Sequence, residues 1–185
     1  MTGTKTNLSA VVVIPPEEVW EPIQRIRRKY DRKIDRWMPH INLLYPFRPQ
    51  EAFEAEAGRI AEPLKDFAPF AVTLGALRHF AHGNDRFTMW LEPEPSEPLA
   101  RLQAALQGLY PDCTEVSSFE GGYVPHLSVG QARGARFLEG RMNEIRAFWT
   151  PLRFEVREIA LIARTERTRF EVARTVPLGA PAPQS

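Results

Sequence analysis

One short pattern occurs twice in this chain and limits how the chain can fold. Residues 39–43 read Pro-His-Ile-Asn-Leu, and residues 125–129 read Pro-His-Leu-Ser-Val. Side chains two residues apart on a strand point to the same face. If each segment is a strand, its histidine shares one face with the following polar residue, while the apolar residues point to the other. The chain must therefore provide two half-buried strands, one for each histidine.

The two histidines, His40 and His126, are 86 residues apart in a chain of 185. Apolar strand-like runs and amphipathic helical segments alternate around them. The predicted strands are 9–14, 41–45, 71–77, 87–91, 126–129, 152–156, 159–163 and 170–176. The predicted helices are 17–30, 51–66, 99–109 and 135–148. The order is β-α-β-α-β-β, then α-β-α-β-β-β, so the two halves of the chain look like similar units.

Prolines and glycines mark the ends of these elements. Because Pro22 conflicts with a continuous helix, the first helix either begins near Glu21 or is kinked. We expect a turn around residues 83–85 and loops at 92–98 and 111–122. If the two halves pack about a pseudo-two-fold axis, both motifs can face one central cleft.

Composition excludes several classes of protein. Hydrophobic residues are 43% and charged residues 25% of the chain, as in ordinary globular domains. The apolar runs are too short for a membrane helix, and the start lacks a secretory pattern. The one cysteine, Cys113, excludes an internal disulfide and a cysteine-cluster zinc site. We expect a cytoplasmic protein. A net charge of +1 does not indicate a duplex-DNA binder, although a local positive pocket could hold a phosphate ligand.

Two facing imidazoles suit the cleavage of a phosphoester. A neutral histidine can remove a proton from water, while a protonated one donates to the leaving oxygen. An unperturbed pKa near 6.5 allows both states at neutral pH. Asn42 and Ser128, next to the histidines on the same faces, can donate hydrogen bonds to phosphate oxygens. This chemistry requires neither a metal nor a cofactor.

The paired motifs resemble the His-x-Thr/Ser-x tetrapeptides of the 2H phosphoesterase superfamily, also called the 2'-5' RNA ligase-like or cyclic phosphodiesterase family. The segment RWMPHINLLYPF is similar to its bacterial and fungal members, and the resemblance extends from Ser9 to Val176. It implies an α+β fold with two lobes, in which two antiparallel sheets flanked by helices surround the cleft. It also implies that His40 and His126 are catalytic and that Ser128 binds phosphate.

The domain expected from this resemblance covers residues 1–176 as a single unit with two lobes. The proline-rich segment 177–185 is expected to be a disordered tail. Asn42 stands where the family has Thr or Ser. Its amide can still donate to a phosphate oxygen, but it is longer than a hydroxyl, so weakened or absent hydrolysis stays open.

Further residues near the motifs are candidates for ligand contacts. Arg133 could reach a phosphate, or it could be an ordinary surface arginine. Phe47 and Tyr123 could stack on a base, or they could be core aromatics. His79 and His82 offer too few ligands for a metal, and we expect them at a strand end and turn.

The resemblance implies a phosphoesterase that hydrolyses a 2',3'-cyclic phosphate, on an RNA end or a nucleotide, to a 2'-phosphate. His126 would activate water and His40 would protonate the 3'-oxygen, although these roles could be reversed. Two alternatives stay open. One is 2'-5' RNA ligation at the same site, and the other is a non-catalytic module that binds RNA ends or nucleotide phosphates. We expect a monomer that binds neither duplex DNA nor membranes.

Overall fold

A computed structural model of the chain describes residues 4–179. The strands are β1 (Ser9–Val13), β2 (Ile41–Leu44), β3 (Phe70–Ala81), β4 (Arg86–Glu94), β5 (Leu127–Arg133), β6 (Leu152–Val156), β7 (Glu158–Ala163) and β8 (Glu171–Pro177). The α-helices are α1 (Trp20–Tyr30), α2 (Phe53–Leu64), α3 (Glu97–Leu109) and α4 (Ala135–Phe148). Short 3-10 turns, Glu17–Val19 and Gln50–Ala52, precede α1 and α2. The predicted order of strands and helices is confirmed.

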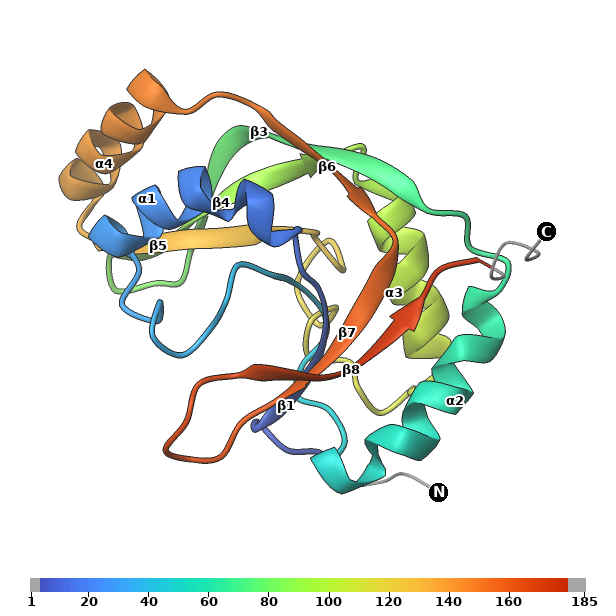
Figure 1. The fold of residues 1–185 in the computed structure, drawn as a ribbon. Helices are drawn as coiled ribbons and strands as arrows, with labels where there is room; N and C mark the ends of the chain where they lie inside the picture. The colour runs from blue at the N-terminus through green and yellow to red at the C-terminus, as the bar shows by residue number, and fades with distance from the viewer. Residues whose placement is uncertain (1–3, 180–185) are drawn as a thin grey trace.

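The strands form two four-stranded antiparallel sheets, with the orders β2-β1-β7-β8 and β5-β4-β3-β6 (Figure 1). The predicted α+β class with two antiparallel sheets is therefore confirmed. Each sheet has a histidine motif at the start of an edge strand, β2 in one and β5 in the other. The pseudo-two-fold relation lies between these two sheets, because their strands correspond position by position.

The expectation that each half of the chain forms its own unit is wrong. Each sheet takes two strands from each half, since β7 and β8 complete the sheet that begins with β1 and β2. The exchange follows from one short connection: β6 runs into β7 through Arg157 alone, so the chain passes directly from one sheet to the other (Figure 1).

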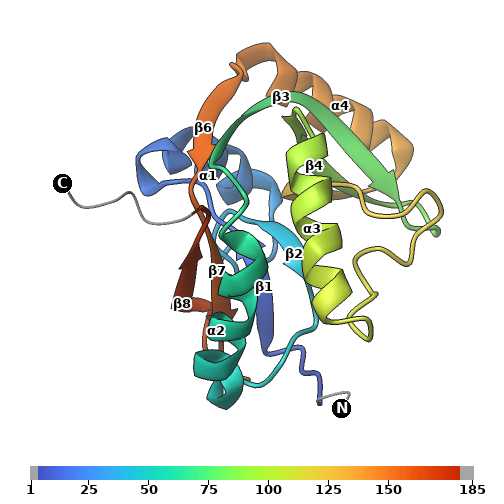
Figure 2. The same cartoon turned by 90° about the vertical axis from the view of Figure 1, so that its right-hand side faces the viewer.

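Two helices each connect strands of one sheet but pack on the other sheet. Helix α1 connects β1 to β2 in the first sheet, but it packs on β5 of the second sheet. Helix α3 connects β4 to β5 in the second sheet, but it packs on β2 of the first. Figure 2 shows α3 running beside β2. This reciprocal packing holds the edge strands β2 and β5 in contact with each other.

Helix α1 begins at Trp20, so Pro22 lies in its first turn, as one of the two predicted alternatives required. Ile23, Ile26 and Tyr30 follow at helical spacing and are buried. Tyr30 lies directly against Gly130 of β5, where an added Cβ would be 2.6 Å from the Tyr30 Cβ. The glycine after the second motif therefore allows the helix to approach the strand closely.

The connection between β4 and α3 is more ordered than the sequence indicates. The loop predicted at 92–98 is wrong, because β4 continues to Glu94 and α3 begins at Glu97. Pro93 is accommodated in β4 because it pairs with Leu74, next to an irregularity in the β3–β4 register. The turn at residues 83–85 is confirmed, since all three residues have positive φ angles.

The predicted disordered tail is wrong for its first residues. Pro177 belongs to β8, and Leu178 is buried in the core. The Leu178 amide donates to the Arg157 carbonyl, and the Gly179 amide donates to the Leu64 carbonyl, so backbone bonds hold this segment against two elements. The rest of the expected tail, residues 180–185, lies outside the described residues.

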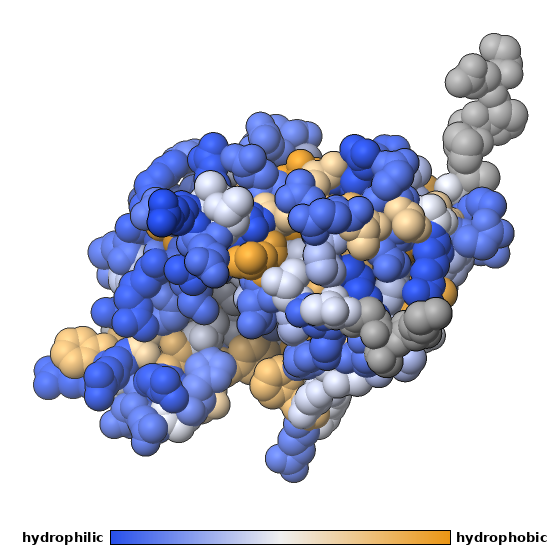
Figure 3. Space-filling model, turned by 90° about the horizontal axis from the view of Figure 1, so that it is seen from below, coloured by the Kyte–Doolittle hydropathy of each residue, from blue (hydrophilic) through white to orange (hydrophobic). Residues whose placement is uncertain are grey.

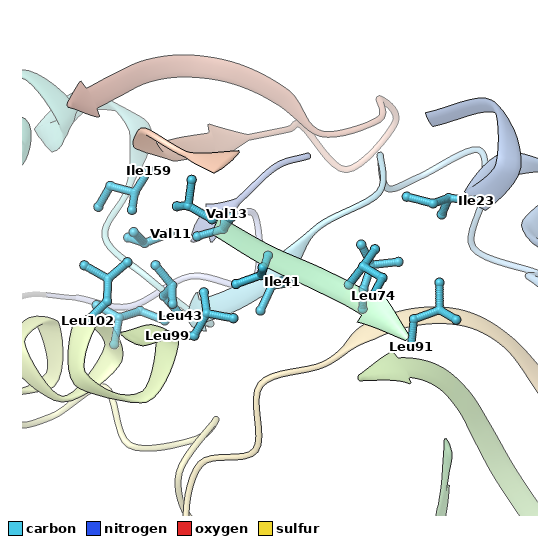
Figure 4. Close-up of a cluster of buried hydrophobic side chains, with 14 of the residues drawn as sticks. Val11, Val13, Ile23, Ile41, Leu43, Leu74, Leu91, Leu99, Leu102 and Ile159 are labelled. Atoms are coloured by element: carbon cyan, nitrogen blue, oxygen red, sulfur yellow. The ribbon is translucent and has the colours of Figure 1, made fainter. Parts of the chain in front are cut away.

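The main core contains apolar side chains from both sheets and all four helices. Figure 4 shows Leu99 and Leu102 of α3 beside Leu43 of β2, which is the contact that holds α3 on the first sheet. The other face of the first sheet carries a second, smaller cluster: Ala10, Val12, Ala160, Ile162 and Phe170. Both faces of this sheet are thus covered over part of their area.

Hydrophilic side chains dominate the face seen in Figure 3, where apolar side chains form only small patches. None of the helices in residues 4–179 is long and apolar enough to cross a bilayer.

The contact between α1 and β5 yields a stability prediction. We expect Gly130→Ala to lower the free energy of unfolding by about 1–3 kcal/mol, because its methyl group overlaps Tyr30 and must displace the helix. Urea unfolding followed by circular dichroism measures this change. Gly140→Ala in α4 is the matched control, because open space surrounds that position and alanine favours helix. Equal stability of both variants would contradict the close approach.

Candidate active site

Both histidine motifs have the alternating burial that their sequences predict. His40 and Asn42 in the first motif, and His126 and Ser128 in the second, are partly exposed. The intervening apolar residues are fully buried: Ile41, Leu43, Leu127 and Val129. Each motif therefore presents an imidazole and a polar group on one face, while its apolar residues attach the strand to the core.

A proline sets the orientation of each imidazole. The Nδ1 atom of His40 lies 2.7 Å from the Met38 carbonyl oxygen, and Nδ1 of His126 lies 2.8 Å from that of Val124. In each case one proline separates the two residues, and its fixed φ angle holds the carbonyl in place. A carbonyl only accepts hydrogen bonds, so Nδ1 must be the donor. The Nε2 atom of each ring is then left to exchange protons with a ligand.

The two motifs are neighbours in space, because the edge strands β2 and β5 contact each other. The hydroxyl of Tyr123, just before the second motif, donates to the Asn42 carbonyl in the first at 2.7 Å. The two imidazoles are also close enough that a charge on His126 lowers the pKa of His40. The fold thus brings together two histidines that the sequence separates by 86 residues.

Aromatic rings support His40. Its imidazole stacks on Trp37, with centroids 4.5 Å apart and an interplanar angle of 15°. Trp37 in turn stacks on the ring of Phe170 at 3.9 Å. These three rings form one stack, which begins at His40 and ends on the apolar cluster of the first sheet.

A buried ion pair holds the segment before His40. Arg27 of α1 donates from Nε to the Asp31 carboxylate at 2.8 Å and from Nη2 to the Trp37 carbonyl at 2.7 Å. Both charged side chains are almost completely buried. The other carboxylate oxygen of Asp31 accepts from Gln131 of β5. One network therefore joins α1, the first motif and the strand of the second motif.

The second histidine lies against two rings from neighbouring strands. Phe80 of β3 and Trp90 of β4 meet His126 edge to face, with centroids 5.0 Å and 5.9 Å away. Trp90 pairs with Ser128 across the strands, and its buried indole nitrogen has no hydrogen-bond partner among the residues that the structure describes. Neither Phe80 nor Trp90 was expected at the site. The pairing of strand 87–91 with the second motif could have indicated Trp90.

Burial favours the neutral form of both histidines. It lowers the pKa of His40 from 6.5 to about 4, and the bond to Met38 opposes this only in part. Burial also lowers the pKa of His126, and the nearby His82 adds to the effect. In the free protein both rings are therefore neutral at pH 7.

The three other residues expected to contact the ligand lie at different distances from the two histidines. The idea that Phe47 stacks on a ligand is wrong, because its ring is fully buried against Tyr110. Arg133 is at the far end of β5 and is not brought to the histidines, about 23 Å along the strand from His126 at about 3.3 Å per residue. Tyr123 adjoins the first motif and is partly exposed.

The remaining histidines lie at the end of β3 and the following turn, as predicted. His79 is in β3, and His82 follows it, with its Nε2 2.9 Å from the Thr88 hydroxyl. Within residues 4–179, no group of three or more His, Cys, Asp or Glu side chains is placed to hold a metal ion.

Comparison with known proteins gives three consistent findings. The model of the 2'-5' RNA ligase superfamily matches residues 15–168. A candidate phosphoesterase of Geobacillus kaustophilus is 28% identical over 126 residues, which are 65% of this chain and 67% of that protein. A similarly named protein of Bacillus pumilus is 27% identical over 125 residues, 65% of this chain and 68% of that one.

Solved structures share the fold. The crystal structure of Escherichia coli LigT complexed with 3'-AMP aligns with a TM-score of 0.63 and 17% identity, over 95% of this chain and 99% of that one. That of Thermus thermophilus TT0787 aligns with a TM-score of 0.60 and 19% identity, over 95% and 98%. At this level of identity the likeness concerns the fold.

The stack on Trp37 leads to a prediction about the first histidine. We expect Trp37→Ala to raise the pKa of His40 from about 4 toward 6.5, because water then replaces the ring that buries the imidazole. Proton NMR of the imidazole resonances, followed as a function of pH, measures this value. Trp37→Phe, which keeps a ring, is the control and should leave the pKa low. An unchanged pKa in Trp37→Ala would contradict the role of the stack.

Proposed function

The chain belongs to the 2'-5' RNA ligase superfamily, and from this membership we propose that it hydrolyses a 2',3'-cyclic phosphate, at an RNA end or on a nucleotide, to a 2'-phosphate. The observation that carries the proposal is the pair of neighbouring imidazoles, each with Nδ1 bound to a carbonyl and Nε2 left for proton transfer. The reaction needs one proton acceptor and one donor, and it needs no metal.

The reaction needs one neutral and one protonated imidazole. His40, with a pKa near 4, is unprotonated at neutral pH and can accept a proton from the attacking water, with His126 as the donor to the departing 3'-oxygen. The opposite roles, which the family resemblance implies, fit the site equally well, because burial lowers the pKa of both rings. A bound phosphate stabilises the charged imidazole, because the anion raises the pKa of both rings.

Polar groups without partners are available to hold the phosphate oxygens. The hydroxyl of Ser128 makes no hydrogen bond within the described residues, and the side-chain oxygen of Asn42 is buried without a partner. The Asn42 amide can turn its NH₂ group toward a phosphate oxygen. The indole N–H of Trp90, also without a partner in residues 4–179, adds a third donor beside Ser128. Such donors stabilise the charge that develops on the phosphate in the transition state.

The ligands named for a protein of the same fold agree with this proposal. Structures of LigT are titled as complexes with 3'-AMP, phosphate, ATP and NADP+. All of these ligands are phosphates, and three are nucleotides. A nucleotide or an RNA end that carries a cyclic phosphate has the same recognition groups.

A non-catalytic binding module is the second candidate, and Asn42 favours it. A binding module retains phosphate affinity without turnover. The variant Asn42→Thr distinguishes the two candidates. It supplies the hydroxyl usual in the family, and it would restore turnover if the amide suppresses it. Ligation through a 2'-5' bond at the same site is the remaining family activity, and it uses the same proton transfers with a 5'-hydroxyl in place of water.

The direct test offers 2',3'-cyclic nucleotides to the purified protein in EDTA and identifies the product by phosphorus NMR. We expect a 2'-phosphate product. His40→Ala and His126→Ala should each lower kcat by about 10²–10⁴-fold, since each removes one proton transfer. His79→Ala is the matched control, because His79 lies outside the pair on β3. Turnover that survives loss of either motif histidine, or that EDTA abolishes, would overturn the proposal.

The lowered pKa values predict the pH dependence of the reaction. The dependence of kcat/KM on pH reports groups in the free enzyme. Because both histidines titrate below 6.5, kcat/KM should be bell-shaped with its maximum below pH 6.5. It should fall as the pH rises further, since both rings lose their proton and no donor remains. Initial rates from about pH 4 to pH 8 measure the profile, and a maximum above about pH 7 would refute the assignment.

A further inference from the structure

A positively charged hollow lies at the opposite end of β5 from the second motif. Residues of α1, β5 and α4 line a cavity of about 480 Å³ there, which we call the α1–β5–α4 hollow. Its cationic lining residues are Arg28, Lys29, Arg32, Arg133 and Arg141. The mechanism proposed above uses none of these side chains.

Some of these charges have no acidic partner. Arg28 binds Glu21, and Lys29 binds Glu144. Within the described residues, the side chains of Arg32, Arg133 and Arg141 make no ion pair, and the hollow's carboxylate, Asp31, is already paired with Arg27. The hollow therefore carries an excess of positive charge, which attracts an anion.

The strand register strengthens this conclusion. Arg133 of β5 lies directly opposite Arg86 of β4. Like charges directly across a strand pair repel each other, and no ion pair offsets either one within residues 4–179. An anion bound between the two guanidinium groups would remove this repulsion. Guanidinium groups also match the geometry of phosphate oxygens.

The position of the hollow suits a chain of phosphates better than a single phosphate. β5 leads from His126 to Arg133, a distance of about 23 Å at about 3.3 Å per residue. This distance spans several nucleotides of a single strand. Phe137, at the edge of the hollow, is 66% exposed and offers a ring on which a base can stack.

We propose that the α1–β5–α4 hollow binds the phosphodiester backbone of a single-stranded nucleic acid whose end is held at His40 and His126. The proposal rests on the proposed function only for the position of that end. A mononucleotide does not reach the hollow, so the site would make an RNA end a better substrate than a free cyclic nucleotide.

The test measures binding separately from turnover. The probe is a fluorescein-labelled single-stranded oligouridylate of about 12 nucleotides with a 3'-hydroxyl, a length within the usual site size of single-strand binders. Fluorescence anisotropy at several salt concentrations gives the Kd. We expect Arg32→Ala/Arg133→Ala to raise the Kd by roughly tenfold. The slope of log K against log salt should also become shallower, by about 0.7 for each lost phosphate contact.

The control removes one positive charge, half of what the double variant removes, from the other side of the same sheet. Arg153→Ala changes an exposed arginine of β6, the edge strand opposite β5, and should leave the Kd unchanged. A change in log Kd for Arg153→Ala half as large as that for the double variant would overturn the proposal, because general charge would then explain the binding. Displacement of the probe by inorganic phosphate at matched ionic strength would also overturn it, in favour of a site for small anions.

A separate arm keeps this inference distinct from the proposed function. Turnover of a 2',3'-cyclic mononucleotide by the double variant should match that of the unmodified protein, while KM for an oligonucleotide with a cyclic-phosphate end rises. If the unmodified protein turns over no cyclic phosphate, the proposed function fails while the binding result still stands. If the double variant turns over the mononucleotide more slowly than the unmodified protein does, the two sites are not separate and the proposal is overturned.

Discussion

The reciprocal packing of α1 on β5 and of α3 on β2 is the constraint on which the rest of this structure depends. Each helix belongs by connection to one sheet and buries its apolar face on the other, so neither sheet can move without exposing core. Gly130 lets Tyr30 approach the strand closely and so permits the packing of α1 on β5. The result is that the two edge strands lie together, and each has a histidine at its start. The neighbouring imidazoles are thus a consequence of helix packing.

Within this frame, each motif sets its own chemistry locally. A proline holds a carbonyl against Nδ1, and burial lowers the pKa of the ring. Together the two effects leave Nε2 of each ring neutral and able to exchange a proton. The buried pair of Arg27 and Asp31 adds rigidity, since it ties the segment before His40 to α1 and to β5. Breaking such a pair leaves an uncompensated charge in the core.

Periodicity in the sequence predicted the local features of the fold, and the family resemblance predicted the two antiparallel sheets, but neither predicted which strands each sheet contains. Alternation in residues 39–43 and 125–129 correctly gave the exposed and buried faces, because strand periodicity is local. The exchange of strands between sheets depends on a one-residue connection at Arg157, which has no periodic signal. Phe47 and Arg133 were misplaced for related reasons: distance along the sequence from a motif does not reveal burial in the core or the direction in which β5 runs.

In the proposed mechanism the Nε2 atoms of His40 and His126 face one phosphate. The most direct measurement is a titration of the protein with inorganic phosphate or a 2'-nucleotide, followed by nitrogen-15 NMR of the imidazole side chains. One equivalent of ligand should shift the Nε2 resonances of both rings along a single binding curve and raise both pKa values. A shift at only one histidine, or two different binding curves, would contradict this mechanism.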